Sequence, residues 1–142
     1  MSRATRFSVA VHALAMIERF AGDQRLNSEM IAGSVGTNAS FVRRVLAMLS
    51  RAGLVRSSPG VAGAQLARGA GKITLLDVYR AVDMEDEHRL AVHDEPSQRC
   101  FIGRHIQGAL DAAIGPAEAA FEAQLRRRTL ADVIGYIAAQ PQ

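Results

Sequence analysis

The chain opens with apolar residues that recur every three or four positions from about residue 5 to residue 21. This spacing places them on one face of an amphipathic helix. The residues on this face are Phe7, Ala10, Val11, Leu14, Ile17 and Ala21. Because polar residues around Asp23 interrupt the pattern, a turn is expected to end the helix there.

A short second helix is predicted over residues 28–35, where Asn27 or Ser28 can serve as the N-cap. Gly36 follows it, at the position where a left-handed backbone commonly ends a helix. The side chains expected to face the core are Ile31, Ala32 and Val35.

A third helix is predicted to begin after Thr37 or Asn38, either of which can cap it, and to end at Gly53. Its expected buried stripe is Val42, Val45, Leu46 and Leu49, which leaves Ser40, Arg43, Arg44, Ala47 and Arg51 elsewhere on its surface. Two such helices joined by a short turn containing glycine are typical of a helix-turn-helix, whose second helix enters the major groove of DNA.

After the third helix the pattern predicts a small β-hairpin, or wing. Residues 54–58 and 65–68 are typical of short strands, and the glycine-rich segment 59–64 between them is typical of a turn. A fourth helix follows, opened by Thr74 and Asp77 at the spacing of a capping box. Its apolar residues at helical spacing are Leu75, Val78, Tyr79 and Val82.

Residues 83–100 are acidic and show no sustained period, so an irregular connection is expected there. Beyond it a long helix reaches about Leu125, with a narrow apolar seam at Ile102, Ile106, Leu110, Ala113, Ala117, Ala120 and Phe121. Such a seam usually packs against another helix, here the same helix of a second subunit.

Two further features lie in the C-terminal part of the chain. Gly115-Pro116 lies inside the long helical pattern and predicts a kink or a break near residues 113–115, because proline removes a backbone donor. Thr129 and Asp132 form a second capping box, which opens a last short helix that ends before Pro141.

The charge distribution divides the chain into unlike halves. Residues 1–72 carry nine Arg and one Lys against three acids, a net +7, whereas residues 73–142 carry seven Arg against eleven acids, a net −4. A basic half beside an acidic half suggests that the first half meets a polyanion. The total of 142 residues is suited to one domain with an extension.

The lack of a recognisable targeting signal and the single cysteine predict a cytoplasmic location. The chain has a single cysteine, so no internal disulfide can form, and its N-terminus lacks an apolar run suited to a signal peptide or a membrane span. A reducing cytoplasm is therefore the expected compartment, and no membrane is expected as a partner.

Several segments carry a family likeness, in this order: RFSVAVHALAMI, IAGSVGTNASFVRRVLAMLSRAGLVRSSPG, QLAR, ITLLDVYRAV and TLADV. With them the chain resembles the Rrf-two type bacterial transcription regulators, which include the iron-sulfur cluster regulator and the nitric-oxide-sensitive repressor. The resemblance implies a homodimer in which an N-terminal winged helix binds DNA and the long later helix crosses to the partner.

The chain departs from the family pattern in two places. The wing reads GVAGAQLAR where members commonly have a run of glycines followed by an aromatic residue, which puts minor-groove contact by the wing tip in doubt. Cluster-binding members use three cysteines before the long helix, whereas this chain offers Cys100 alone. A branch without a cluster is therefore expected, with no cofactor.

The expected DNA-binding residues lie on the helix-turn-helix and the wing. Asn38, Ser40 and Arg43 are candidates for base edges or for the phosphates beside them, while Arg44, Arg56 and Arg68 suit phosphates. Phe41 is suited either to a thymine methyl group or to the core, and the arginines are also compatible with an ordinary solvated helix face. The full set is Ser28, Thr37, Asn38, Ser40, Phe41, Arg43, Arg44, Arg56, Ser58, Gly60 and Arg68.

Cys100 has two open interpretations, a small buried apolar residue or a redox sensor whose thiolate is favoured by Arg99 and Arg104. His88 and His93 match no strong zinc spacing, so no metal site is predicted. No nucleophile, base and orienting group occur together, so no catalytic residues and no enzyme activity are predicted.

Together these patterns predict a mainly α protein: a winged helix-turn-helix over residues 1–82, an acidic connecting loop and sensor region over 83–100, and a dimerisation helix with a short C-terminal helix over 101–142. The predicted protein is a homodimeric regulator that binds a pseudo-palindromic operator in double-stranded DNA. The resemblance to the family favours a repressor. The input is left open between thiol oxidation, by an oxidant effector, and a small ligand. The alternative is a protein–protein interaction module on the same scaffold without specific DNA binding.

Overall fold

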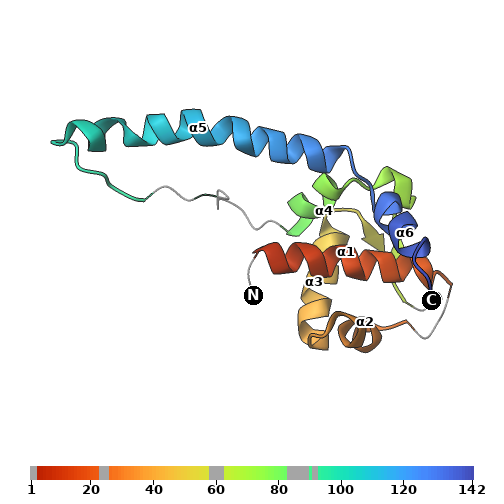
Figure 1. Cartoon of the computed structure of the whole chain (residues 1–142). Helices are drawn as coiled ribbons and strands as arrows, with labels where there is room; N and C mark the ends of the chain where they lie inside the picture. Colours follow the sequence, from red (N-terminus) through yellow and green to blue (C-terminus); the bar gives the residue numbers. More distant parts are fainter. Residues whose placement is uncertain (1–2, 23–25, 58–62, 83–89, 91–92) are drawn as a thin grey trace.

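The computed structural model describes residues 3–22, 26–57, 63–82, 90 and 93–142 (Figure 1). It confirms the predicted class, mainly α with a small two-stranded hairpin. The elements in chain order are α1 (Arg3–Arg19), α2 (Ser28–Val35), α3 (Ala39–Arg51), β1 (Val55–Arg56), β2 (Gln65–Leu66), the 3₁₀ turn η1 (Ala70–Lys72), α4 (Leu75–Val82), α5 (Phe101–Arg126) and α6 (Leu130–Ala138).

The described residues between 3 and 82 form one packed unit, which we call the head. Within it α1 contacts α2, α3 and α4, so the first helix is the centre of the core. The largest fully buried side chains are Leu14, Ile17, Ile31, Val42, Val45, Leu49, Leu54, Ile73, Val78 and Val82 of the head, together with Leu130 of α6. Burial of these apolar groups is the main source of the stability of the head.

The predicted core faces are mostly confirmed, although Leu46 of α3 is only half-buried and two further residues need correction. Ala21 lies beyond the last residue of α1 and is exposed, because the helix ends at Arg19. In α4 the buried leucine is Leu76, whereas Leu75 at the first helical position is only half-buried. The capping box that starts α4 is formed as predicted: Asp77 N–H donates to the Thr74 hydroxyl and Thr74 N–H donates to the Asp77 carboxylate.

The wing is shorter than its sequence pattern suggests. β1 and β2 pair antiparallel with Val55 opposite Leu66 and Arg56 opposite Gln65. Ala67 N–H also donates to the Leu54 carbonyl oxygen at 3.0 Å, which fastens the base of the hairpin beside the end of α3. Residues 58–62 lie outside the described part of the chain.

The chain returns to the head after α5. Leu75 N–H donates to the Arg128 carbonyl at 2.8 Å, and Leu130 N–H donates to the Ile73 carbonyl at 2.9 Å. Leu130 is completely buried in the core of the head, and α6 lies against α1 and η1. The second predicted capping box, of Thr129 and Asp132, starts α6. The short C-terminal helix therefore packs with the head, although α5 separates the two in sequence.

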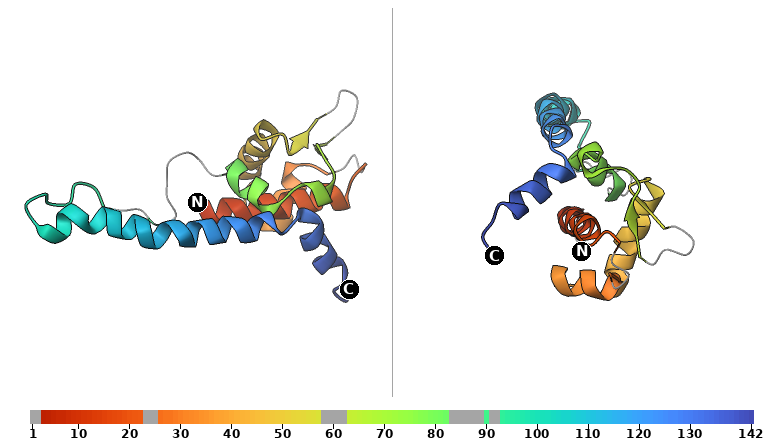
Figure 2. Two further views of the ribbon diagram at one scale, coloured as in Figure 1. Left: turned by 90° about the horizontal axis from the view of Figure 1, so that it is seen from above. Right: turned by 90° about the vertical axis from the view of Figure 1, so that its right-hand side faces the viewer.

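α5 is a single helix that extends far beyond the head (Figure 2). Of the kink or break predicted near residues 113–115, the break is wrong, because the helix continues through Pro116. Gly115 has no Cβ to meet the proline ring, which reduces the local clash, and the alanine-rich sequence on both sides favours helix. None of the described helices combines the length and the hydropathy needed to cross a membrane.

Candidate nucleic-acid interface

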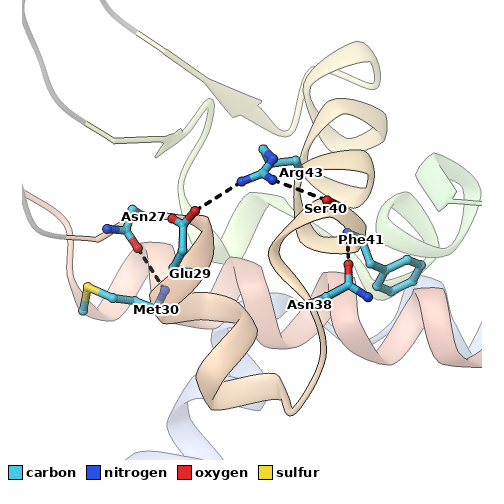
Figure 3. Close-up of polar contacts among 7 residues, drawn as sticks. All are labelled: Asn27, Glu29, Met30, Asn38, Ser40, Phe41 and Arg43. Atoms are coloured by element: carbon cyan, nitrogen blue, oxygen red, sulfur yellow. Dashed lines mark hydrogen bonds and ion pairs between the residues drawn. The ribbon is translucent and has the colours of Figure 1, made fainter.

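The turn between α2 and α3 is fixed by caps on both sides. Gly36 adopts the left-handed conformation with φ of 83°, and its N–H donates to the Ala32 carbonyl at 2.8 Å. Asn38 then caps α3, since its side-chain oxygen accepts a hydrogen bond from Phe41 N–H at 2.9 Å. Asn27 caps α2 in the same way through Met30 N–H (Figure 3). These bonds set the angle between the two helices.

α3 has one buried face and one exposed face. Val42, Val45 and Leu49 are completely buried against the head. The polar residues of the helix are all exposed: Ser40, Arg43, Arg44, Ser50 and Arg51, and the capping residue Asn38 just before the helix is exposed as well. One side of this helix packs in the core, and the other side carries cationic and hydroxyl groups. Such a surface is suited to bind a polyanion that carries hydrogen-bonding groups.

Arg43 is held between the two helices. Its Nη1 donates to Glu29 Oε1 of α2 at 3.3 Å, and its Nη2 donates to the Ser40 hydroxyl one turn earlier in α3 at 3.4 Å (Figure 3). Both charged side chains are more than half exposed. Sequence reasoning missed Glu29, although its position in the first turn of α2 was a signal that it could face the neighbouring helix.

Phe41 belongs to the core. It is 6% exposed, and the guanidinium of Arg44 lies over its ring at 5.6 Å from the centroid. Of its two interpretations, the structure therefore favours packing, with Arg44 placed by a cation–π contact at the edge of the exposed face.

The two wing arginines have different surroundings. Arg56, on β1, is exposed. Arg68 donates to the Asp77 carboxylate at 3.0 Å, the same oxygen that caps the start of α4. This contact ties the base of the wing to α4, so Arg68 has a structural partner beside any contact with phosphate. Ser58 and Gly60 lie outside the described residues.

An open groove of about 450 Å³ lies between the start of α2 and the wing. Ser28 and Glu29 line it from α2, and Ser57 and Gly63 line it from the hairpin. The half-buried Thr37 lies in the turn, where its N–H donates to the Ala32 carbonyl. Among the residues predicted to contact DNA, those that the structure describes therefore lie on α2, the turn, α3 and the wing.

Cys100 occupies the N-cap position of α5 and is exposed in the single chain, so it does not pack in the core of its own chain. His105 lies one turn into the helix, with its ring 4.9 Å from that of Phe101. His88 and part of the acidic segment lie outside the described residues. In the part that is described, no three His, Cys, Asp or Glu side chains gather in a metal-binding arrangement.

The predicted dimerisation seam is largely uncovered. No residue of α5 is buried, and Phe101 and Ile102 are 69% and 64% exposed. Ile106 and Leu110 are half-exposed, and Ala113 and Ala117 are exposed. Phe121 differs, because its ring meets Tyr79 of α4 edge-on at 5.5 Å between centroids within the same chain. Arg80 and Glu122 form an ion pair at the same joint, at 3.2 Å.

The comparisons with known proteins agree with this arrangement. Residues 3–136 match the Rrf2 family, described as iron-dependent transcriptional regulators. The chain is 39% identical over 133 residues to YwnA of Bacillus subtilis, named as an HTH-type transcriptional regulator, covering 94% of this chain and 97% of that protein. A crystal structure named as a DNA-binding protein is 36% identical, with a TM-score of 0.72, and covers 91% of this chain and 98% of its own.

IscR of T. potens shares the fold, with a TM-score of 0.70 at 21% identity over 96% of this chain and 90% of its own. The head with its exposed α3 and its wing defines a winged helix-turn-helix regulator, a DNA-binding protein of transcription control and not an enzyme. The chain belongs to the Rrf2 family. The predicted resemblance is thereby confirmed.

The family description names iron, but the residues of this chain do not fit a cysteine-ligated iron–sulfur cluster. The whole sequence contains one cysteine, whereas such clusters are held by several cysteine thiolates. That cysteine is exposed at the start of α5, and the described residues assemble no other donor set around it. No step in the function proposed below uses iron.

Proposed function

We propose that the protein acts as a homodimeric repressor that places two copies of α3 in successive major grooves of a pseudo-palindromic operator. The observation that carries this proposal is the division of α3, whose apolar side is completely buried while its exposed side presents Ser40, Arg43 and Arg44. Recognition helices of a symmetric dimer read half-sites about 34 Å apart, one turn of DNA.

Within each half-site the described residues divide by chemistry. Arg43 and Ser40 lie at the start of α3 and suit base edges in the major groove. Arg44, Arg56 and Ser28 suit phosphates, which contribute affinity without reading sequence. Asn38, Thr37 and Arg68 already have structural partners, so we assign them to positioning the reading surface as well as to any contact with the DNA backbone.

The exposed seam of α5 supports the dimer. A helix of 26 residues spans about 39 Å and buries no side chain within its own chain. Exposed apolar side chains along one stripe of such a helix favour a partner helix. A second copy would cover Ile102, Ile106, Leu110, Ala113 and Ala117 and would place two heads at a defined separation.

The input signal is proposed to act on the start of α5. Cys100 is accessible there, and the helix joins the head through the Tyr79–Phe121 and Arg80–Glu122 contacts. Oxidation of Cys100, or a small ligand bound near it, would change the packing at one end of α5 and the separation of the two heads. We also propose a cytoplasmic location, where DNA is accessible.

Selection of DNA by the purified protein tests the proposal. A random-sequence library is enriched in parallel with dithiothreitol and with diamide, and binding is repeated at two salt concentrations. The expected result is an enriched palindrome with steep loss of affinity as salt rises, because phosphate contacts release counterions. Loss of the palindrome on oxidation, restored in Cys100→Ser, would support the thiol input. No enrichment in either condition would contradict operator binding and favour an interaction module on the winged-helix scaffold.

A further inference from the structure

Glu29 is an acidic residue in an unfavourable place for a DNA-binding head. Residues 1–72 contain only three acids, and one of them lies at the start of α2 beside the exposed face of α3. A carboxylate at such a surface repels the phosphates of an approaching duplex. Its side chain is 68% exposed, so the core does not require it.

The contact that Glu29 makes is with the arginine best placed to read bases. Figure 3 shows Arg43 between Glu29 of α2 and Ser40 of α3, with one guanidinium nitrogen donating to each. Arg43 thus bridges the two helices of the helix-turn-helix. Arg44, its neighbour, points to the Phe41 ring and makes neither contact.

The geometry of arginine explains why such a bridge matters. A guanidinium has several N–H donors in one plane, so the groups that bind Glu29 and Ser40 leave others free to donate to a base. Arginine most often reads guanine, through paired bonds to O6 and N7. A free arginine loses rotamer freedom when it docks in that way, whereas one already held in place loses less.

We propose that Glu29 is a positioning residue for base recognition: it holds the guanidinium of Arg43 in the orientation that reads a guanine in the operator half-site. This inference rests on the proposed operator binding. Through Arg43, Glu29 raises the preference for guanine at one base pair, while its negative charge lowers the affinity for DNA of any sequence. Removing Glu29 should therefore weaken the base preference and strengthen general DNA binding, and the two effects can be measured separately.

The test compares selected sequences for the wild type, Glu29→Gln and Glu29→Ala, with Glu18→Gln as the control. Glu18 is an exposed carboxylate of α1, so the control changes net charge equally. We expect both Glu29 variants to reduce the preference for guanine at one position of each half-site by about two- to fivefold, the range of an exposed ion pair. Their binding to non-operator DNA is expected to tighten, because the repelling carboxylate is gone, and circular dichroism verifies the fold.

A double-mutant cycle with Arg43→Ala shows whether Glu29 acts through Arg43. In the Arg43→Ala background, Glu29→Gln is expected to leave the remaining base preferences unchanged. An unchanged guanine preference in Glu29→Gln, or an equal effect with and without Arg43, would overturn the inference while leaving operator binding intact. Absence of any enriched sequence for the wild type would instead overturn the proposed operator binding, and the role of Glu29 with it.

Discussion

The head and α5 use their apolar residues in opposite ways. α3, with 13 residues, buries Phe41, Val42, Val45 and Leu49, whereas α5, with 26 residues, buries none. The head therefore has a hydrophobic core, whereas the apolar seam of the long helix packs against no core in the same chain. Within one chain the core of the head is completed by Leu130 of α6, while the apolar side chains of α5 are covered only when a second surface packs against them.

Contacts between α4 and α5 join the two regions. Tyr79 of α4 lies between Phe7 of α1 and Phe121 of α5, with ring centroids 6.0 and 5.5 Å away. Beside it Arg80 reaches Glu122. Because these contacts meet α5 near its C-terminal end, most of the helix projects away from the head (Figure 2).

The largest expected effect is a loss of stability, and it distinguishes the head from α5. Leu14→Ala removes a completely buried side chain from the head and is expected to lower the free energy of unfolding by about 2–5 kcal/mol. Ile102→Ala, on the exposed stripe of α5, is expected to change the unfolding of the head by less than about 0.5 kcal/mol. Urea denaturation followed by circular dichroism measures both. Equal losses would mean that α5 is part of the core that stabilises the head.

The second effect concerns association. Ile106→Glu places a charge in the middle of the stripe and is expected to weaken the dimer roughly a hundredfold, because burying an unpaired carboxylate is costly. Sedimentation equilibrium measures the dissociation constant. The control is Ala112→Glu, at an exposed position off the stripe on the same helix. Dissociation by the control alone, or by neither variant, would place the dimer interface elsewhere.

The third effect is local to the reading helix. Asn38→Ala removes the side-chain cap of α3 and is expected to cost about 1 kcal/mol of stability without DNA present. Asn38→Asp keeps an oxygen acceptor for Phe41 N–H and serves as the matched control. Thermal unfolding compares them. If Asn38→Ala keeps wild-type stability but loses DNA binding, the side chain acts through DNA contact and not through the cap.

The smallest effect is at the joint. Glu122→Gln breaks the exposed ion pair with Arg80 and is expected to change stability by less than about 1 kcal/mol, with the difference shrinking at high salt. Differential scanning calorimetry at low and high ionic strength measures it. A larger loss that persists at high salt would show that this pair holds α5 on the head more firmly than its exposure suggests.

Local patterns in the sequence determined the elements and most of their ends. The capping box of Thr129 with Asp132 starts α6 as predicted, and Gly36 ends α2 in the left-handed conformation. Asn27 and Asn38, each one of two predicted candidates, cap α2 and α3. These features are predictable because each depends on residues within one turn of each other. Hydrophobic periodicity likewise located the helix-turn-helix and the exposed position of Arg43 and Arg44.

The tertiary structure decided what depends on residues far apart in the chain. It placed Leu130 in the core of the head, joined Arg43 to Glu29 across 14 positions, and tied Arg68 to Asp77. It also carried α5 through Pro116, where the sequence favoured a kink or a break. Periodicity shows which face of a helix is apolar, but the partner of that face, and the orientation of a long charged side chain, are fixed only when the helices pack together.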